Sequence, residues 1–418
     1  MGHINNPDKE YHLLQTRFDK MVTGAPASPY LTKILEILYS PEEANLARKI
    51  PTQPTSLKKL VAKTALPEEK LKDKLTEMTE RGVLVDFEIK GKKYYTLPPV
   101  VIGFFEYVFM RSRDNLPMAE LANLFENYMD ENDKFARSVF QKETQMGRAL
   151  VQEDFLDDQT EILDWEKASA LIKSAPTLGV SLCACRHKAE HLGKNCSAPM
   201  EVCLTLGFSA ETMIRNKIAR QISTEEGLDI LKKCREAGLV QTGDNVKKHV
   251  SFICNCCSCC CGMLKSLNTF NLKQTIVSSN FILEINKDKC VACGRCVKAC
   301  PVNALQIETK DDQKKLILNE ELCLGCGVCC STCKPQALKM VARPKRVFTP
   351  ETFFDKTVAM ALERGKLADL ITDQKDNLSS LALGRIISLI EKLPPYKALI
   401  AIKPLKSYFL NKIVKGIK

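Results

Sequence analysis

A doubled cysteine motif between residues 290 and 333 constrains the fold of this chain most strongly. The first copy reads CVACGRCVKAC from Cys290 to Cys300, and the second reads CLGCGVCCSTC from Cys323 to Cys333. Each copy has the spacing C-x2-C-x2-C-x3-C, and the copies lie 33 residues apart. An Ala-Leu pair repeats at the same offset, at 304–305 and 337–338. The repeat predicts a pseudo-two-fold domain in which each half carries one cysteine loop.

This pattern resembles the bacterial-type ferredoxin domain with two [4Fe-4S] clusters, over residues 279–342. In that domain three cysteines of a run hold one cluster, and the fourth ligates the other cluster. The resemblance implies one ligand set of Cys290, Cys293, Cys296 and Cys333, and a second of Cys323, Cys326, Cys329 and Cys300. Two positions depart from the pattern: Lys334 precedes Pro335, and Cys330 stands where the first copy has Val297. We expect Cys330 to be a small buried side chain. The alternative, a pair of zinc sites, usually uses separated cysteine pairs.

The distribution of cysteines and the charge limit the class of protein. The 418 residues include 20 cysteines, and none lies before Cys183 or after Cys333. The sequence has no signal-like region and no apolar run long enough to span a bilayer. The thiols therefore indicate metal binding in a cytoplasmic protein. Because such thiolates oxidise readily, they also suggest an anaerobic or low-oxygen cell. The formal net charge of +11 suits nucleic acid, an anionic membrane surface or an acidic redox protein.

The N-terminal region, residues 1–150, resembles a winged helix-turn-helix domain. Helices are expected after Pro29, Ser40, Ser56 and Pro67, with Ser40 as an N-cap and Gly82 as the glycine that ends the fourth helix. Residues 83–89 and 93–97 then flank a Lys-Gly-Lys turn, which predicts a hairpin. The fourth helix is nearly neutral, whereas a DNA-reading helix normally needs clear positive charge. We therefore favour a docking or structural role over DNA binding for this region.

Five aromatic residues and one leucine after this hairpin are expected to form a helical core: Phe104, Phe105, Tyr107, Phe109, Phe125 and Leu121.

The middle region, residues 151–278, holds a second concentration of cysteines. Two strands are expected to end side by side, one before Cys183 and one entering the segment 254–261, which has six cysteines in eight residues. Adjacent cysteines make strained disulfides, so a metal centre is favoured, and an additional iron–sulfur centre over zinc. The first-choice ligands are Cys183, Cys185, Cys196, Cys254, Cys256, Cys257 and Cys260.

Other residues of the middle region are assigned to supporting roles. Cys203 and Cys261 are the next candidates for ligands, and Cys234 is expected in a helix core. His187 and His191 are expected to be surface or supporting groups. Arg186 is expected either to offset cluster charge or to form an ordinary salt bridge.

The expected fold is α+β and multidomain: a winged-helix-like part (1–150), a cysteine-rich metal domain (151–278), an inserted two-[4Fe-4S] ferredoxin domain (279–342) and a helical tail (343–418). The tail should contain a helix from 378 to 393, then a basic segment from 394 to 418 with six lysines and no acids. That segment could lie on a membrane surface, although packing on the protein itself is favoured.

The expected function is electron transfer with a redox partner protein, through two [4Fe-4S] clusters to or from the middle centre. One alternative is a reductase whose middle centre is the active site. Another is a redox-responsive DNA-binding regulator. The sequence has no nucleotide, flavin or catalytic-triad motif, and no small-molecule substrate is identified from it.

Overall fold

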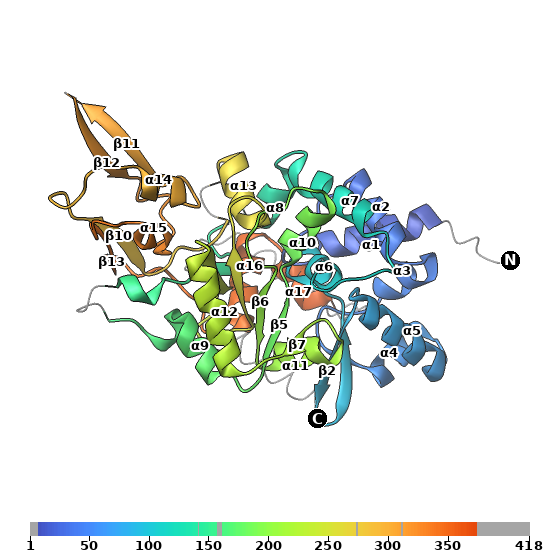
Figure 1. Ribbon diagram of the computed structural model, residues 1–418. Coiled ribbons are helices and arrows are strands. Elements are labelled where there is room, and N and C mark those ends of the chain that lie inside the picture. The colour runs from blue at the N-terminus through green and yellow to red at the C-terminus, as the bar shows by residue number, and fades with distance from the viewer. Residues whose placement is uncertain (1–6, 141, 157–160, 273–274, 311, 374–418) are drawn as a thin grey trace.

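The computed structural model describes residues 7–373, apart from 141, 157–160, 273–274 and 311, and contains both helices and strands. The N-terminal helices lie at one end of the molecule and the cysteine repeat at the other, with a six-stranded sheet between them (Figure 1). No helix in the described ranges is both long and apolar enough to cross a membrane. The predicted helix at 378–393 and the basic segment at 394–418 lie outside the described residues.

Five helices and a small sheet form the N-terminal end. The helices are α1 (Pro7–Asp19), α2 (Pro29–Leu38), α3 (Pro41–Ala47), α4 (Leu57–Thr64) and α5 (Glu68–Arg81). The strands β1 (Thr55–Ser56), β2 (Val85–Ile89) and β3 (Lys92–Thr96) pair antiparallel in the order β1-β3-β2. The predicted helices after Pro29, Ser40, Ser56 and Pro67, and the predicted hairpin, are therefore confirmed.

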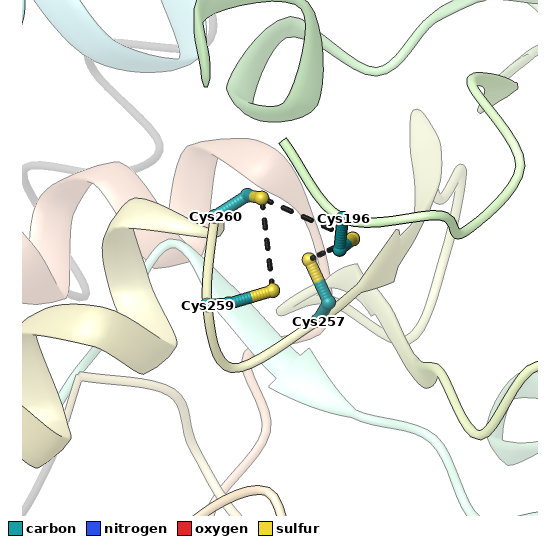
Figure 2. A group of neighbouring side chains, drawn as sticks. All are labelled: Cys196, Cys257, Cys259 and Cys260. Carbon is teal, nitrogen blue, oxygen red and sulfur yellow. Dashed lines mark hydrogen bonds between the residues drawn. The ribbon is translucent and has the colours of Figure 1, made fainter. Parts of the chain in front are cut away.

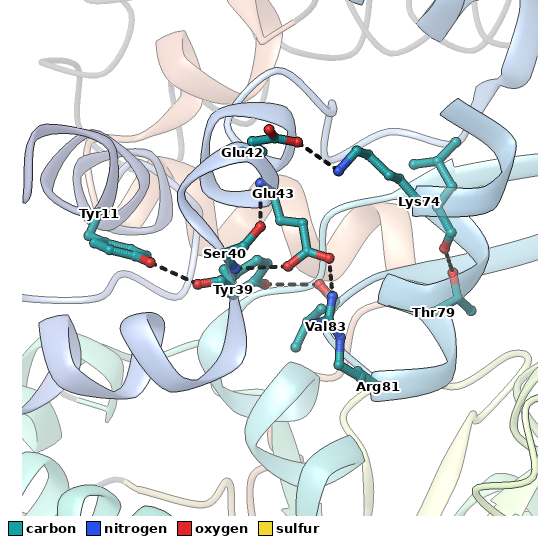
Figure 3. A network of polar contacts seen from close by, with 10 residues as sticks. Tyr11, Tyr39, Ser40, Glu42, Glu43, Lys74, Thr79, Arg81 and Val83 are labelled. Atoms are coloured by element: carbon teal, nitrogen blue, oxygen red, sulfur yellow. Dashed lines mark hydrogen bonds and ion pairs between the residues drawn. The ribbon is translucent and has the colours of Figure 1, made fainter. Parts of the chain in front are cut away.

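Polar contacts join the start of α3 to the end of α5 (Figure 3). The Ser40 hydroxyl accepts from Glu43 N at 3.3 Å, and Ser40 N donates to the Glu43 carboxylate at 2.8 Å. This reciprocal pair is a capping box. The same carboxylate pairs with Arg81, and Gly82, at φ 81°, ends α5 as predicted. These contacts hold the end of α5 against α3, and the hairpin starts a few residues later, at Val85.

Helices α6 (Phe105–Phe109), α7 (Met118–Asp130) and α8 (Lys134–Phe140) follow the hairpin. They contribute to the largest apolar core of the described residues, which they share with the N-terminal helices. The predicted core is confirmed for five of its six side chains, which are buried: Phe104, Phe105, Phe109, Leu121 and Phe125. The sixth, Tyr107, is half-buried.

A six-stranded sheet forms the centre of the molecule. Its strands are β4 (Gly147–Ala149), β5 (Leu178–Leu182), β6 (Glu201–Leu206), β7 (Arg220–Gln221), β8 (Val240–Asp244) and β9 (Phe252–Cys256). They are arranged β4-β8-β9-β6-β5-β7, and all neighbours pair antiparallel. The expectation that the strands before Cys183 and Cys254 lie side by side is wrong, because β6 separates β5 from β9. Both strands are antiparallel to β6, so they still end at the same edge of the sheet.

Five helices accompany this sheet: α9 (Ala168–Ser174), α10 (Ala184–His191), α11 (Phe208–Arg215), α12 (Thr224–Glu236) and α13 (Gly262–Phe270). Ile172 of α9 and Leu231 of α12 pack in one apolar core with Leu204 and Ile253 of the sheet. Cys234 lies in that core with no exposed surface, as predicted for a mid-helix cysteine.

The cysteine repeat folds into two short helices and four strands. Their order is β10 (Phe281–Ile285), α14 (Arg295–Ala299), β11 (Leu305–Lys310), β12 (Gln313–Leu318), α15 (Val328–Ser331) and β13 (Leu338–Ala342). The outer strands β10 and β13 pair antiparallel, as do β11 and β12. Each half therefore contributes a strand, a helix and a second strand, in the same order along the chain.

The chain returns to the body of the molecule after this segment. Helices α16 (Phe353–Glu363) and α17 (Leu367–Thr372) end the described part. Lys356 of α16 forms an ion pair with Asp244 of β8, and both side chains are buried. The Lys366 ammonium donates to the carbonyls of Asp19 and Met21. These contacts connect the tail to the sheet and to the N-terminal helices.

Candidate metal centres

Two cavities, each open to solvent on one side, lie within the cysteine repeat. The first is lined by Cys290, Cys293, Cys296 and Cys333, together with apolar groups such as Leu316 and Leu338. The second is lined by Cys323, Cys326, Cys329 and Cys300, with Leu283 and Met340 among its apolar groups. Each cavity therefore receives three cysteines from one copy of the motif and the fourth from the other copy.

The sulfur spacing around these cavities is wider than the spacing around a single ion. Among the described residues, three or more potential ligand atoms lie within 4.8 Å of one another only in one group, and that group lies elsewhere. In a four-iron cluster each thiolate binds a different iron, so the sulfurs stand farther apart than around one ion. The four thiols and the apolar walls of each cavity thus fit a [4Fe-4S] cluster.

The two cysteine loops have different surroundings although their sequences repeat. In the first loop Val291 is 69% exposed, and Cys293 is also exposed. In the second loop the equivalent residues, Leu324 and Cys326, are buried, because this loop packs against the central sheet. Burial raises the pKa of the Cys326 thiol well above its ordinary value.

The end of β9 separates the middle cysteines into two groups. Cys254 and Cys256 lie on the strand and share one face, because side chains of a strand point in turn to opposite faces. Cys257 follows the strand, and its sulfur lies 3.7 Å from that of Cys196. We call the first set the inner thiol group: Cys183, Cys185, Cys203, Cys254, Cys256 and Cys261. We call the second set the outer thiol group: Cys196, Cys257, Cys259 and Cys260.

Five members of the inner thiol group shift one another's pKa values. Interaction with the Cys203 and Cys256 thiols raises the pKa of Cys254. Interaction with the Cys254 and Cys261 thiols lowers the pKa of Cys256 to about 6, and interaction with Cys261 raises the pKa of Cys185. Thiols from β6, β9 and the starts of α10 and α13 therefore lie near one another.

The outer thiol group is the compact one (Figure 2). The sulfurs of Cys196 and Cys257 are 3.7 Å apart, as are those of Cys259 and Cys260, and Cys260 is 4.0 Å from Cys196. All four sulfurs lie within 4.8 Å of one another. Three of the cysteines belong to the loop after β9, and Cys196 comes from the segment between α10 and β6.

Arg186 of α10 is fully buried beside these thiols. Its guanidinium donates to Asn255 O at 3.1 and 3.2 Å and to Cys257 Sγ at 3.6 Å. The neighbouring Cys260 thiol and this positive charge lower the pKa of the Cys257 thiol to about 4. Two roles were expected for Arg186. These contacts favour the role in which its positive charge offsets the negative charge of the thiolates.

The structure divides the seven first-choice ligands between both groups. Cys183, Cys185, Cys254 and Cys256 belong to the inner thiol group, and Cys196, Cys257 and Cys260 to the outer one. Sequence reasoning missed Cys259, although its spacing from Cys257 repeats the C-x-C of 254–256 and was a usable signal.

Cys183 and Cys185 do not follow one another along an extended segment. Cys183 is the N-cap of α10 and Cys185 lies in its first turn. His187 was expected to be a surface or supporting group, and the structure contradicts the surface position. Its ring is buried, and Nδ1 lies 2.8 Å from Phe109 O. Cys330 is buried, as predicted, and does not line either cavity.

A comparison with family models supports iron–sulfur binding by the first cysteine loop. Residues 283–306 match the family model of the 4Fe-4S binding domain. Neither a search of curated proteins nor a search of solved structures finds a match. Proteins with such domains typically pass electrons to redox partners. The chain thus contains a 4Fe-4S binding domain, beside a separate cysteine cluster suited to a metal.

Proposed function

We propose that this chain transfers electrons between a redox partner protein and a centre held by the inner thiol group, through two [4Fe-4S] clusters. Cys290, Cys293, Cys296 and Cys333 would hold the first cluster, and Cys323, Cys326, Cys329 and Cys300 the second. The two separate cavities, with their exchanged fourth cysteines, support this assignment. When bound, such clusters supply one-electron chemistry.

The exposure of the two loops supports an order for the transfer. The first loop presents Val291 and Cys293 to solvent, so a partner can approach the first cavity closely. Exposed lysines flank this loop in the sequence at positions 287, 289 and 298, and two exposed acids lie among them at 284 and 288. Positive charge at this end favours an acidic partner surface, because complementary potentials speed association.

The observation that carries the proposal is the contact between the second cavity and the inner thiol group. Cys326 and the inner residues Cys256 and Cys261 belong to one buried apolar core, and Cys300 and Cys323 pack against it. A chain of hydrogen bonds crosses the same boundary. Gln152 N donates to Cys326 O at 3.0 Å, and the Gln152 side-chain amide donates to Leu239 O at 3.5 Å.

The strand that follows Leu239 completes this connection. Val240, the first residue of β8, pairs directly with Cys256 of the inner thiol group. The second cavity is therefore connected to the inner thiol group without intervening solvent-exposed chain. This is the arrangement that a relay from the exposed loop to the sheet requires.

The N-terminal part would act as a docking element within this protein. The β2–β3 hairpin packs on α11, where the rings of Phe87 and Phe208 stack with centroids 5.4 Å apart. Asp86 pairs with Arg215 at 3.0 Å, and this interaction lowers the pKa of the Asp86 carboxyl against the opposing effect of burial. A hairpin that is held in this way supports a role in docking rather than in reading DNA.

Iron and acid-labile sulfide per chain test the proposal on anaerobically purified protein. Two clusters require about eight irons, and a cluster in the inner thiol group adds more. In a variant with Cys254→Ser and Cys256→Ser, we expect the iron above eight to disappear with its sulfide. The control is Cys234→Ala, a core cysteine outside both groups, which should retain all iron. About eight irons in both the wild type and the double variant would refute an iron–sulfur centre in the inner thiol group.

The order of transfer is tested by rapid mixing with a reduced donor. Cys326→Ser should abolish reduction of the inner centre, while the first cluster is still reduced at its wild-type rate. Unchanged reduction of the inner centre in this variant would show that electrons bypass the second cavity.

A further inference from the structure

The outer thiol group has the spacing of ligands around a single ion. Four sulfurs bound to one tetrahedral ion at about 2.3 Å lie about 3.8 Å from one another. The three shortest separations here are 3.7, 3.7 and 4.0 Å, and the remaining pairs stay within 4.8 Å (Figure 2). The cysteine sulfurs that hold a [4Fe-4S] cluster lie farther apart than these four, as do the sulfurs around the two cavities of the cysteine repeat. The geometry thus separates this group from the iron–sulfur sites.

Disulfide formation does not account for this arrangement. A disulfide places its sulfurs about 2.05 Å apart, and the pair Cys259–Cys260 is adjacent in sequence, where a disulfide is strained. The other close pair, Cys196 and Cys257, is separated by 3.7 Å. Four thiols that point toward one common centre are better satisfied by a metal ion than by one or two strained bonds.

The surrounding charge also suits a metal bound by thiolates. Four thiolates around a divalent ion carry a net charge of −2. The buried Arg186 guanidinium, whose hydrogen bonds go to Cys257 Sγ and to Asn255 O, offsets part of that charge. Burying a cation is costly unless an anion accompanies it, so Arg186 itself favours an anionic site at this position.

We propose that Cys196, Cys257, Cys259 and Cys260 form a closed site for one zinc ion, distinct from the iron–sulfur centres. Soft thiolate ligands in tetrahedral geometry select zinc or iron, and four protein ligands without an open position are typical of structural zinc sites. The ion fastens the loop after β9 to the segment between α10 and β6. This proposal does not depend on the proposed electron transfer.

The role of the ion follows from what these two segments carry. The loop after β9 continues directly from Cys254 and Cys256, and the segment containing Cys196 connects α10 to β6. Those elements supply Cys183, Cys185 and Cys203 to the inner thiol group. Besides the thiols, a hydrogen bond from Cys183 N to Met200 O at 2.7 Å and an ion pair of Lys194 with Glu126 at 3.8 Å join the 193–200 segment to other elements. Zinc at the outer site would therefore cross-link two segments that also carry inner thiols.

Metal analysis of the anaerobically purified full-length chain tests this site. We expect about one zinc per chain in the wild type, and close to none in Cys259→Ser and in Cys196→Ser. Iron and sulfide should stay near wild-type values in Cys259→Ser. Because Cys259 is exposed, its replacement leaves the apolar core unchanged. The matched control is Ser258→Ala, in the same exposed loop, which should retain the zinc.

A second measurement uses the wild-type chain alone, so it does not depend on how the variants fold. Cobalt(II) exchanged into the outer site should give the intense visible absorption of a tetrahedral tetrathiolate complex. The proposal is overturned if cobalt gives no such absorption, or if Cys259→Ser loses iron and sulfide together while the wild type holds no zinc. One iron without sulfide at this site would overturn the choice of zinc. Loss of zinc with the iron retained supports the proposal and leaves the electron-transfer proposal to be judged separately.

Discussion

Gly325 offers a sharp test of the second cysteine loop, because the repeat contains its own control. Gly325 has φ +66°, and its equivalent in the first copy, 33 residues earlier, is Ala292 at φ 48°. The same left-handed backbone therefore carries an alanine in the exposed loop and a glycine in the buried one. A Cβ added at Gly325 would lie 2.1 Å from Phe281 O and 2.3 Å from Ser279 Oγ.

The expected cost of Gly325→Ala follows from these distances. A left-handed alanine costs roughly 1–2 kcal/mol. The clash adds the cost of overpacking, about 1–3 kcal/mol, because Phe281 O belongs to the backbone of β10 and cannot rotate away. The free energy of unfolding should fall by about 2–5 kcal/mol in total. The shift of the loop displaces Cys326, so the second cavity should lose its cluster, which is about four irons.

Anaerobic chemical denaturation and iron analysis measure both effects. The control, Ala292→Gly, relieves left-handed strain and increases the entropy of the unfolded chain, so stability should change by less than about 1 kcal/mol. Full iron content and unchanged stability in Gly325→Ala would refute the packing of the second loop against β10.

Two further predictions concern stability and the ligand set. Lys356→Ala should cost about 3–5 kcal/mol, because it leaves Asp244 charged and buried. Lys247→Ala breaks an exposed pair with Glu351 and should cost less than about 1 kcal/mol; equal costs in urea denaturation would contradict the burial argument. Cys330→Ala should keep all iron and sulfide, with a stability loss of about 1 kcal/mol from the removed buried sulfur. Loss of about four irons would instead make Cys330 a ligand.

Local signals predicted the N-terminal helices well. The Ser40 cap, the Pro41 start and the Gly82 stop act within a few residues, so their physical effect is visible in the sequence. The two cysteine runs likewise resemble a known domain, and the ligand sets that this resemblance implies match the cysteines that line the two cavities.

The division of the middle cysteines was not visible in the sequence, because it depends on where strands end and which strands are neighbours. Cys256 and Cys257 are adjacent in the chain, but β9 ends between them, and they pack in different apolar cores. Cys185 lies in a helix rather than on an extended segment, and β6 separates β5 from β9. The pairing of Lys356 with Asp244 joins residues more than a hundred positions apart, and no local pattern signals it.

The ends of the cysteine repeat meet at one point, and this bears on how such a chain can be assembled in evolution. Phe281 pairs with Ala342 across β10 and β13, and Arg343 N donates to Asn280 O at 2.8 Å. The polypeptide thus leaves the central body and returns to it at the same place, as inserted units in proteins commonly do. A segment with adjoining ends can be exchanged as one cassette in a single genetic event. The central sheet and the N-terminal helices would keep their connectivity, so the same body could be supplied with a different electron carrier.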